Sequence, residues 1–424
     1  MVAVLPFRAL RYNPEQISNL SEVIAPPYDV ISPEHQERLY QASPYNVVRL
    51  ILSRQFPHDT PTENRYTRAR RDFEAWRKAG VLVADPTPAL YLIQHTFSDE
   101  GERRSRLGFT ALLELGDGIE RQVYRHETTL ATPREDRMKL LEAVPANLSP
   151  IFCVYPDAQG FIHSTLQAQM LEAPPLARSA FNGDTVQVWA LTDTRLIRAL
   201  AERLRSIAVF IADGHHRFEV ACGKRAQYRH VMSYFVSMAD PSLIVRPIHR
   251  IVRHPALARL DAIRQICQLE PAPDLPSVLQ RLQHGPPSSE PAEGAGAPHG
   301  RFGYSDGNAL YHATVHPDRL GRWLSAPSMP GPVAALDVSI LHGLVLPALT
   351  GAVPGSEQAL VTYTPRAAEA LETVAGAPGL SMWLLRGIPV DQIYALAAQG
   401  LTLPPKSTYF SPKVPSGLTI HSLA

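Results

Sequence analysis

The sequence predicts a mixed α+β protein with a large N-terminal domain and a smaller C-terminal α/β region. Three observations support this: the chain has 424 residues, strand-like apolar runs alternate with helical stripes, and a proline-rich block interrupts the pattern. Because 424 residues exceed the usual size of one domain, two or three compact units are expected. We expect domains at 1–284 and 301–424. The block GPPSSEPAEGAGAPHG at 285–300 would be a flexible linker or surface excursion between them.

The elements expected before this block combine helices with paired strands. The segment NRYTRARRDFEAWRKAG places Tyr66, Phe73 and Trp76 on one helical stripe, and Gly80 would end that helix. The other expected elements of this region are strands at 89–97 and 107–115, joined in a hairpin by SDEGERRSR, and a helix at 134–144.

After the block, strands and helices alternate again. The expected elements are strands at 360–364 and 382–386 and helices at 365–374 and 389–400. In the last helix, Ile393, Leu396 and Ala397 have the spacing of an inward face. Both halves of the chain therefore predict mixed α and β structure, with no internal repeat.

The most informative segment is IAVFIADGHHRFEVAC at residues 207–222. Its first six residues are apolar and predict a buried strand. Phe218, Ala221 and Cys222 have the i, i+3, i+4 spacing of a helix face. The segment therefore reads as a strand, a polar turn and a helix, an arrangement in which ligands often bind at the strand end.

The turn of this segment gathers chemically active side chains. Gly214 lets the backbone bend or approach a ligand closely, and the unpaired N–H groups at the start of the helix favour an anion there. Asp213, His215, His216 and Arg217 surround this spot with acid, imidazole and guanidinium groups. We expect a ligand-binding or catalytic role. In the alternative interpretation, Asp213 only caps the helix and one histidine is a partly buried structural residue.

Two other segments are candidate site loops. In VIAPPYDVIS, prolines stiffen a loop that presents Tyr28 and Asp29, although Asp29 could instead cap a helix begun at Pro33. In VYRHETTL, His126 and Glu127 form a second acid–base pair, and Glu127 could serve as a general base. The alternative for this segment is a solvated strand end.

The C-terminal segment LPPKSTYFSPK at 403–413 adds cations and hydroxyls between prolines. It lacks the glycines of a phosphate-binding loop, so we reject a Walker site. Lys406 can still bind a phosphate as a point charge, with Ser407 beside it. Weaker candidates, each of which could be structural instead, are Arg49 in PYNVVRL, Asn147 in ANLSPIF, and His249 with Arg250 in RPIHRIV.

The amino-acid composition limits which binding partners and which cellular compartment we expect for this protein. With 41 basic and 40 acidic side chains, the chain has no global attraction to nucleic acid or anionic lipid. No apolar stretch reaches membrane-spanning length, and the N-terminal residues lack a leader pattern. The three cysteines, Cys153, Cys222 and Cys267, are scattered, which fits buried thiols in a reducing compartment. We expect a cytoplasmic protein that needs neither membrane nor nucleic acid; the oligomeric state stays open.

Eight motifs, taken together and in order, resemble the bacterial and archaeal DUF1015 family. These motifs are PFRALRYNP, VIAPPYDVIS, PYNVVRL, RLGFTALLEL, RHETTL, ANLSPIF, IADGHHRFEVA and PPKSTYFSPKVPSGL. The resemblance covers nearly the whole chain. It implies little chemistry, because the family name denotes an unknown function.

A more distant resemblance implies a mechanism. DGHHRFEVA is similar to a segment of the ParB and sulfiredoxin superfamily in which a glycine, charged residues and a helix hold nucleotide phosphates. Free-serine kinases of that superfamily, which use ADP or ATP, carry a similar cluster and a separate catalytic glutamate. The resemblance implies a ParB-like nucleotide-binding core, with Asp213 holding Mg²⁺ or the substrate and Glu127 as base. This chain differs by its greater length, its extra C-terminal region and its PPKSTYF segment.

The expected function is Mg²⁺-dependent phosphoryl transfer from ADP or ATP to the hydroxyl of a small metabolite such as free serine. Such a reaction needs positioned positive charge, a metal ligand and a group that orients or deprotonates the hydroxyl. The expected roles are catalysis by Glu127, His126 and His216, cofactor binding by Gly214, His215, His216, Arg217, Lys406 and Ser407, substrate binding by Tyr28, Asp29, Arg49 and Asn147, and metal binding by Asp213.

Two alternatives stay open. A metal-dependent hydrolase would use the same groups as ligands of a transition metal, namely His126, Glu127, Asp213, His215 and His216. A non-catalytic regulator would sense a nucleotide without turning it over. No helix-turn-helix segment is recognisable, which argues against direct reading of DNA.

Overall fold

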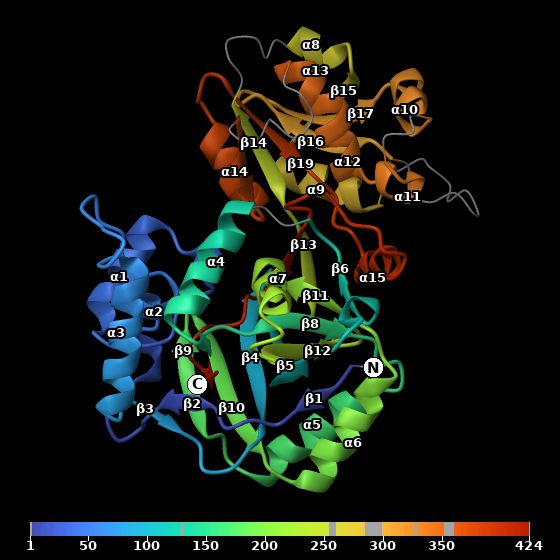
Figure 1. The fold of residues 1–424 in the computed structure, drawn as a ribbon. Helices are drawn as coiled ribbons and strands as arrows, with labels where there is room; N and C mark the ends of the chain where they lie inside the picture. The colour runs from blue at the N-terminus through green and yellow to red at the C-terminus, as the bar shows by residue number, and fades with distance from the viewer. Residues whose placement is uncertain are drawn as a thin grey trace. The chain divides into compact units, whose positions relative to one another are not determined.

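The structure is a computed structural model that describes residues 2–128, 131–253, 260–284, 299–325, 329–351 and 360–423. Its chain forms two compact units. The first unit comprises Met1–Arg125, Thr129–Ile244 and Phe410–Ala424, and the second comprises His126–Thr128 and Val245–Tyr409. Both units combine helices with a mixed or antiparallel sheet, so the predicted α+β class is confirmed (Figure 1).

The first unit is built on a nine-stranded sheet in which β6, β11, β8, β12, β5, β4, β10 and β9 follow one another and β1 pairs with β5. β11 is parallel to β6 and antiparallel to β8, and β12 is parallel to β8, so the sheet is mixed. Its strands are β1 (Val4–Leu5), β4 (Leu90–Asp99), β5 (Glu102–Glu114), β6 (Val123–Arg125), β8 (Ile151–Tyr155), β9 (Ala177–Phe181), β10 (Asp184–Leu191), β11 (Val209–Asp213) and β12 (His230–Ser237). Two short pairs accompany the sheet: β2 (Leu10–Tyr12) with β3 (Leu82–Ala84), and β7 (Ala146–Asn147) with β21 (His421–Ser422).

The predicted hairpin is present as β4 and β5, but its strands are longer than expected. The charged residues that the sequence assigned to the turn continue the ladder, with Ser98 opposite Arg103. Only Glu100 and Gly101 lie between the strands, and both have a left-handed backbone, with φ of 50° and 84°. Charged residues therefore continue this ladder whether exposed, as Glu102 and Arg103 are, or buried, as Arg106 is.

The helices of the first unit form two hydrophobic cores with the strands. One core lies between the large sheet and α5, α6 and α7. The other joins α1, α2, α3 and α4 around Phe73 and Trp76, the two residues of the predicted stripe that are fully buried. The helical segments are η1 (Leu20–Glu22), η2 (Tyr28–Val30), α1 (Pro33–Ala42), α2 (Val48–Ile51), α3 (Arg65–Lys78), η3 (Ile119–Arg121), α4 (Ala131–Ala143), α5 (Phe161–Glu172), α6 (Thr194–Arg205) and α7 (His215–Gly223).

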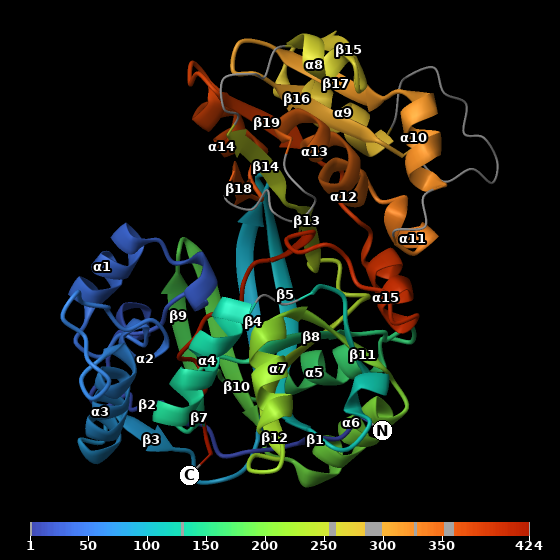
Figure 2. The ribbon, with the colours of Figure 1, turned by 45° about the horizontal axis from the view of Figure 1, so that its top comes forward.

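The second unit contains a six-stranded sheet in the order β15, β17, β16, β19, β14, β18 (Figure 2). Its core packs the sheet against α9 and α14. The strands are β14 (His249–Arg253), β15 (Cys267–Ala272), β16 (Arg301–Ser305), β17 (Leu310–Val315), β18 (Val361–Thr364) and β19 (Leu380–Leu384); β13 (Ile244–Pro247) and β20 (Thr408–Ser411) contain points where the chain passes from one unit to the other. The helices are α8 (Leu260–Arg264), α9 (Leu275–His284), α10 (Pro317–Leu324), α11 (Gly331–Ala334), α12 (Asp337–Ile340), the π-helical turn η4 (Leu341–Val345), α13 (Leu346–Thr350), α14 (Ala367–Val374) and α15 (Val390–Ala398).

The division into units differs from the boundary expected at 285–300. Residues 285–298 of that block lie outside the described residues. β15, before the block, pairs with β17, after it, with Cys267 opposite Val315. Both flanks therefore belong to the second unit, whereas Phe410–Ala424 returns to the first. A proline-rich composition indicates that a segment contributes little to a hydrophobic core. It does not indicate which of the flanking strands pair with each other.

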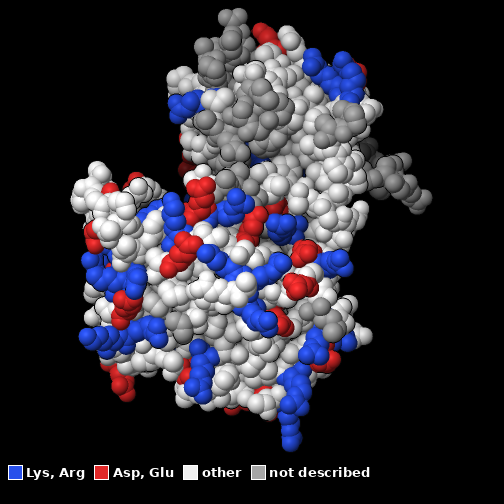
Figure 3. Space-filling model, in the orientation of Figure 1, with Lys and Arg blue, Asp and Glu red and all other residues white. Residues whose placement is uncertain are grey.

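The described surface carries both signs of charge. Figure 3 shows Lys and Arg interspersed with Asp and Glu over the visible face of the first unit. This mixture agrees with the near balance of 41 basic and 40 acidic residues in the chain. Among the helices of the described ranges, none is long and apolar enough to cross a membrane.

Candidate functional site

The polar bend predicted from the sequence is present at the end of β11. Residues 209–212 are buried in the sheet, and α7 begins directly after Gly214. Gly214 has φ of 90°, a backbone conformation that residues with a side chain rarely adopt. A Cβ atom at this position would lie 2.9 Å from Nη2 of Arg217. The bend therefore requires glycine, for its backbone and for the space that the Arg217 guanidinium occupies.

Asp213 is held by two cations. Nη2 of Arg217 donates to Oδ2 at 2.7 Å, and Nζ of Lys413 donates to Oδ1. Burial acts to raise the pKa of the Asp213 carboxyl, but the charges of Lys413 and Arg217 outweigh it and lower that pKa to about 2. The N-cap residue of α7 is Gly214, which has no side chain to cap the helix. The carboxylate therefore fixes two cations at the start of the helix.

Arg217 also connects the bend to the segment before β8. Its Nη1 donates to the carbonyl of Pro150, and its side chain is 15% exposed. Its Nε is buried and has no hydrogen-bond partner among the described residues. A buried guanidinium N–H without an acceptor is an available donor for a bound anion.

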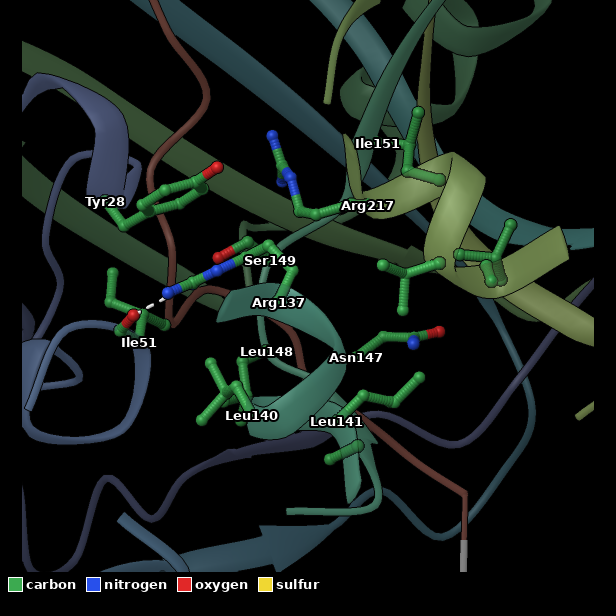
Figure 4. Close-up of a pocket in the computed structure, with 14 residues that line it drawn as sticks. Tyr28, Ile51, Arg137, Leu140, Leu141, Asn147, Leu148, Ser149, Ile151 and Arg217 are labelled. Carbon is green, nitrogen blue, oxygen red and sulfur yellow. Dashed lines mark hydrogen bonds between the residues drawn. The ribbon is translucent and has the colours of Figure 1, made fainter. Parts of the chain in front are cut away.

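A cavity of about 70 Å³ lies beside Arg217 in the first unit (Figure 4). Its polar lining comes from Tyr28, Arg137, Asn147, Ser149 and Arg217. Its apolar walls come from Ile51, Leu140, Leu141, Ala146, Leu148, Ile151, Val220, Ala221 and Val231. The arrangement of a few polar groups in an apolar cavity is typical of small-ligand sites.

Arg137 lies over the ring of Tyr28 at this cavity. Cζ of Arg137 lies 3.8 Å from the centre of the Tyr28 ring, a cation–π contact. Arg137 donates from Nη1 to the carbonyl of Ile51 at 3.0 Å and from Nε to Asp136 at 2.9 Å. Burial raises the pKa of the Tyr28 phenol, so its hydroxyl keeps its proton and can donate to a ligand.

The structure brings together two of the four residues assigned to the substrate. Tyr28 and Asn147 line the cavity, and Oδ1 of Asn147 accepts from the backbone N–H of Met232 at 2.8 Å. Asp29 is exposed in η2 and is not part of the lining. Arg49 lies on α2 with its Cζ 4.4 Å from the Tyr40 ring and its Nη2 donating to the Tyr40 carbonyl. Those contacts explain Arg49 as a structural residue.

The residues assigned to the phosphate lie in different units. His215 is buried at the first position of α7, and His216 is half-buried beside it. Both lie in the first unit with Arg217, whereas Lys406 and Ser407 lie in the second. The helix start therefore gathers one set of predicted residues, and the C-terminal loop holds the other.

The second unit joins the other acid–base pair to the C-terminal loop. Backbone N–H groups of Ser407 and Thr408 donate to Oε1 of Glu127 at 3.1 and 3.0 Å, and the Thr408 hydroxyl donates to the same oxygen. Nε2 of His126 lies 2.8 Å from that hydroxyl. Since the hydroxyl proton is directed to Glu127, His126 is the donor in this contact. His126 and Glu127 thus hold the loop.

No metal centre is evident in the described part of the chain, where no three His, Cys, Asp or Glu side chains converge. The alternative of a hydrolase with a transition-metal centre therefore has no ligand cluster among these residues. The cysteines do not supply one either. Burial raises the pKa of Cys153 and Cys267 to about 12 and that of Cys222 to about 11, as expected for structural thiols.

The sequence patterns assign no role to several residues of the site. Lys413 was visible only as a second lysine in a proline-flanked segment, and it reaches Asp213 across 200 residues. Arg137 reads as an ordinary charged residue of a helix. Ser149 is two residues after Asn147, in the same motif, and this proximity was the available signal.

Comparisons with solved structures give distant likenesses. A free serine kinase in complex with AMP has a TM-score of 0.38 and 10% sequence identity, and the alignment covers 71% of this chain and 86% of that one. A conserved hypothetical protein from Pyrococcus furiosus has a TM-score of 0.38 and 11% identity, with 74% and 95% covered. SbnI with a C-terminal truncation, from Staphylococcus aureus, has a TM-score of 0.38 and 11% identity, with 74% and 87% covered.

Sequence comparison is more decisive. No curated protein matches the chain. The family model described as "Protein of unknown function (DUF1015)" matches residues 4–339, which is most of the 424 residues and includes the bend at Gly214. The C-terminal motif with Lys406 and Lys413 lies beyond the matched residues. The sequence resemblance is thereby confirmed, and the chain belongs to the DUF1015 family.

Proposed function

We propose that this protein binds a nucleoside diphosphate or triphosphate and transfers its terminal phosphoryl group to the hydroxyl of a small metabolite, such as free serine. The observation that supports this most strongly is the cationic start of α7. Arg217 and Lys413 carry two positive charges there, and Asp213 carries one negative charge, so the group is net positive. Phosphoryl transfer depends mainly on such fixed positive charge around the phosphate.

The backbone of the bend supports the same role. α7 begins at His215 directly after Gly214, and the helix dipole favours negative charge at this end. In a helix that follows a buried strand, this is the position where phosphates bind in many nucleotide-binding folds. We assign the phosphate chain of the nucleotide to this position, with Nε of Arg217 as a further donor.

The adjoining cavity suits the small acceptor. At about 70 Å³ it is far below the roughly 300–1,000 Å³ of a pocket that encloses a drug-sized ligand. It can hold a small metabolite, with the nucleotide base extending elsewhere. Tyr28, Asn147 and Ser149 offer hydroxyl and amide groups to the acceptor.

The proposed reaction is a displacement at phosphorus. The acceptor oxygen forms a bond to the terminal phosphorus, and the bond from that phosphorus to the bridging oxygen breaks. ADP would thus release AMP, and ATP would release ADP. The acceptor's hydroxyl proton must leave, and His216, in the first turn of α7 beside Arg217, is our candidate to take it.

The residues at the bend do not offer a ready magnesium ligand. Asp213 is the carboxylate assigned to the metal, and each of its oxygens already accepts from a cation. Mg²⁺ would have to displace Lys413 or Arg217 to bind it. In the proposed reaction, the positive charge around the phosphate comes from Arg217 and Lys413.

The proposal is tested by binding and turnover together. Thermal shift with ADP, ATP, CTP and amino acids, each with and without Mg²⁺, identifies the ligands, because a ligand that binds only the native state raises its stability. Phosphorus NMR with the stabilising nucleotide and serine then detects product. Arg217→Gln should remove the nucleotide-dependent shift, whereas the exposed Arg198→Gln on α6, with the same charge change, should retain it.

The outcomes separate this proposal from the alternatives. Product formation by the wild type that disappears in His216→Ala supports phosphoryl transfer. Nucleotide binding without product for any acceptor would instead support a nucleotide-sensing regulator. Absence of a shift with every nucleotide would exclude both.

A further inference from the structure

The cavity beside Arg217 has a polar end and an apolar end. Arg217 lies in the first turn of α7, whereas Val220 and Ala221, which line the same cavity, lie in the second turn. Figure 4 shows Arg217 and Tyr28 toward one side of the cavity and Leu141 of α4 toward the other. A ligand whose reacting group faces the start of α7, the polar end, therefore extends the rest of its structure among the aliphatic side chains of the apolar end.

Both cations that line the cavity already have a carboxylate partner. Nε and Nη2 of Arg137 donate to Asp136, and Nη1 donates to the Ile51 carbonyl, so each nitrogen of this guanidinium has an acceptor. Arg217 is paired with Asp213, and its buried Nε, which we assign to the phosphate, is the donor left over. Among the described residues of the lining, none is acidic. A charged acceptor would therefore bury its charges in this cavity without a partner, which is costly.

The apolar end belongs to the closely packed interior of the first unit. Val220 is 3% exposed and Ala221 is 7% exposed. Because protein interiors rarely contain voids larger than a water molecule, a cavity of about 70 Å³ between such side chains indicates a ligand site. An apolar cavity of about 150 Å³ admits a six-carbon ring, so by proportion this cavity admits about three carbon atoms.

We infer that the acceptor is a neutral alcohol whose aliphatic chain occupies the apolar end of this cavity and whose hydroxyl lies at the polar end. The inference rests on the proposed function, because it concerns the acceptor of that reaction. The product would be the monophosphate ester of the alcohol. Serine suits this cavity less well, because its ammonium and carboxylate find no free partner there and its single methylene leaves most of the aliphatic wall uncovered.

The dependence of binding on chain length tests the inference. Titration of the methyl-labelled protein with linear ethanol, propanol, butanol and hexanol, followed by NMR, gives an affinity for each alcohol. The affinity should rise about fourfold with each methylene up to butanol and then level off or fall. The methyl signals of Leu141, Val220 and Ala221 should shift with butanol and not with serine. Affinity that does not depend on chain length, or equal shifts with serine, would overturn the inference.

Two substitutions at Leu141 should change the preferred chain length in opposite ways. This residue lines the cavity and is half-buried. Leu141→Ala enlarges the apolar end and should move the preference from butanol to hexanol, whereas Leu141→Phe fills it and should weaken butanol binding at least about tenfold. Leu171→Ala and Leu171→Phe, at a position of α5 that is 90% exposed, are the matched controls and should keep the preference for butanol. An unchanged preference in both Leu141 variants would place the alcohol elsewhere.

Turnover separates this inference from the proposed function. With the nucleotide that stabilises the wild type, phosphorus NMR should detect butyl phosphate, with kcat/KM about tenfold or more above that for serine. A higher kcat/KM for serine than for butanol would overturn the inference and leave the proposed function standing. A wild type that binds no nucleotide would refute the proposed function, and the methyl shifts with butanol would then decide by themselves whether the cavity holds an aliphatic alcohol.

Discussion

Lys413 donates to the carboxylate of Asp213, which precedes it by 200 residues in the chain. Both side chains are largely buried, at 11% and 13% exposure. The contact fastens the C-terminal segment of the first unit to the bend between β11 and α7. It also places a second cation beside Arg217, without which Asp213 would neutralise the charge of the bend. The pair therefore serves both the fold and the proposed phosphate site.

Asp213→Asn should reveal this pair through the pH dependence of stability. Because the folded-state pKa is about 2 and the ordinary value is 3.8, the carboxylate stabilises the fold fully above pH 3.8 and loses its effect as the pH falls through 2. At pH 7 the variant should be less stable by about 3 kcal/mol, since two partly buried cations lose their partner. Urea denaturation at a series of pH values should show this difference shrinking between pH 4 and pH 2. A difference that stays constant down to pH 2 would show that Asp213 is not ion-paired.

Gly214→Ala should disrupt the bend. The substitution places a methyl group in a backbone with φ of 90° and 2.9 Å from the Arg217 guanidinium. We expect a loss of about 1–3 kcal/mol in the free energy of unfolding, together with loss of nucleotide binding as Arg217 moves. Gly116→Ala is the matched control, because a Cβ atom there meets nothing within 4 Å. Retention of full nucleotide affinity in Gly214→Ala would separate Arg217 from the ligand.

His249 should impose a pH dependence on the stability of the second unit. Burial, aided by the charge of Arg250, lowers its pKa from 6.5 to about 4, and its Nδ1 accepts from the Leu385 N–H. Between pH 6.5 and 4 the unfolded chain binds a proton that the folded one does not, so stability falls as the pH falls. His249→Asn keeps an acceptor and should remove roughly 3 kcal/mol of this loss. The exposed His58→Asn is the control for the loss of an imidazole, and an equal effect of both variants would refute the assignment.

The local parts of the fold and site were predictable because their signals are contiguous. An apolar run that stops at DGHHR specifies a strand, a bend and a helix start, and these lie at β11 and α7. The buried residues of α15 are the three that its spacing indicates, Ile393, Leu396 and Ala397. In such segments, the spacing of apolar residues within one or two turns is enough to predict which side chains are buried.

The parts that the sequence did not indicate depend on contacts between distant residues. Nothing near Lys413 indicates Asp213 as its partner, and nothing near Glu127 indicates that its carboxylate would accept from Ser407 and Thr408. The division into units differs from the expected boundary at 285–300 for the same reason, since the pairing of β15 with β17 spans the proline-rich block. The residue type suggested an acid–base role for Glu127. Only the structure shows that its Oε1 accepts hydrogen bonds from Ser407 and Thr408.

The most direct measurement is a crystal structure of the protein with a nucleotide that carries sulfur on its terminal phosphate, such as ADPβS, located by the anomalous signal of the sulfur. The account predicts that the sulfur peak lies at the start of α7, within hydrogen-bond reach of Arg217 and the backbone N–H groups that follow Gly214. A nucleotide bound in the crystal with its terminal phosphate at any other place on the chain would contradict the account.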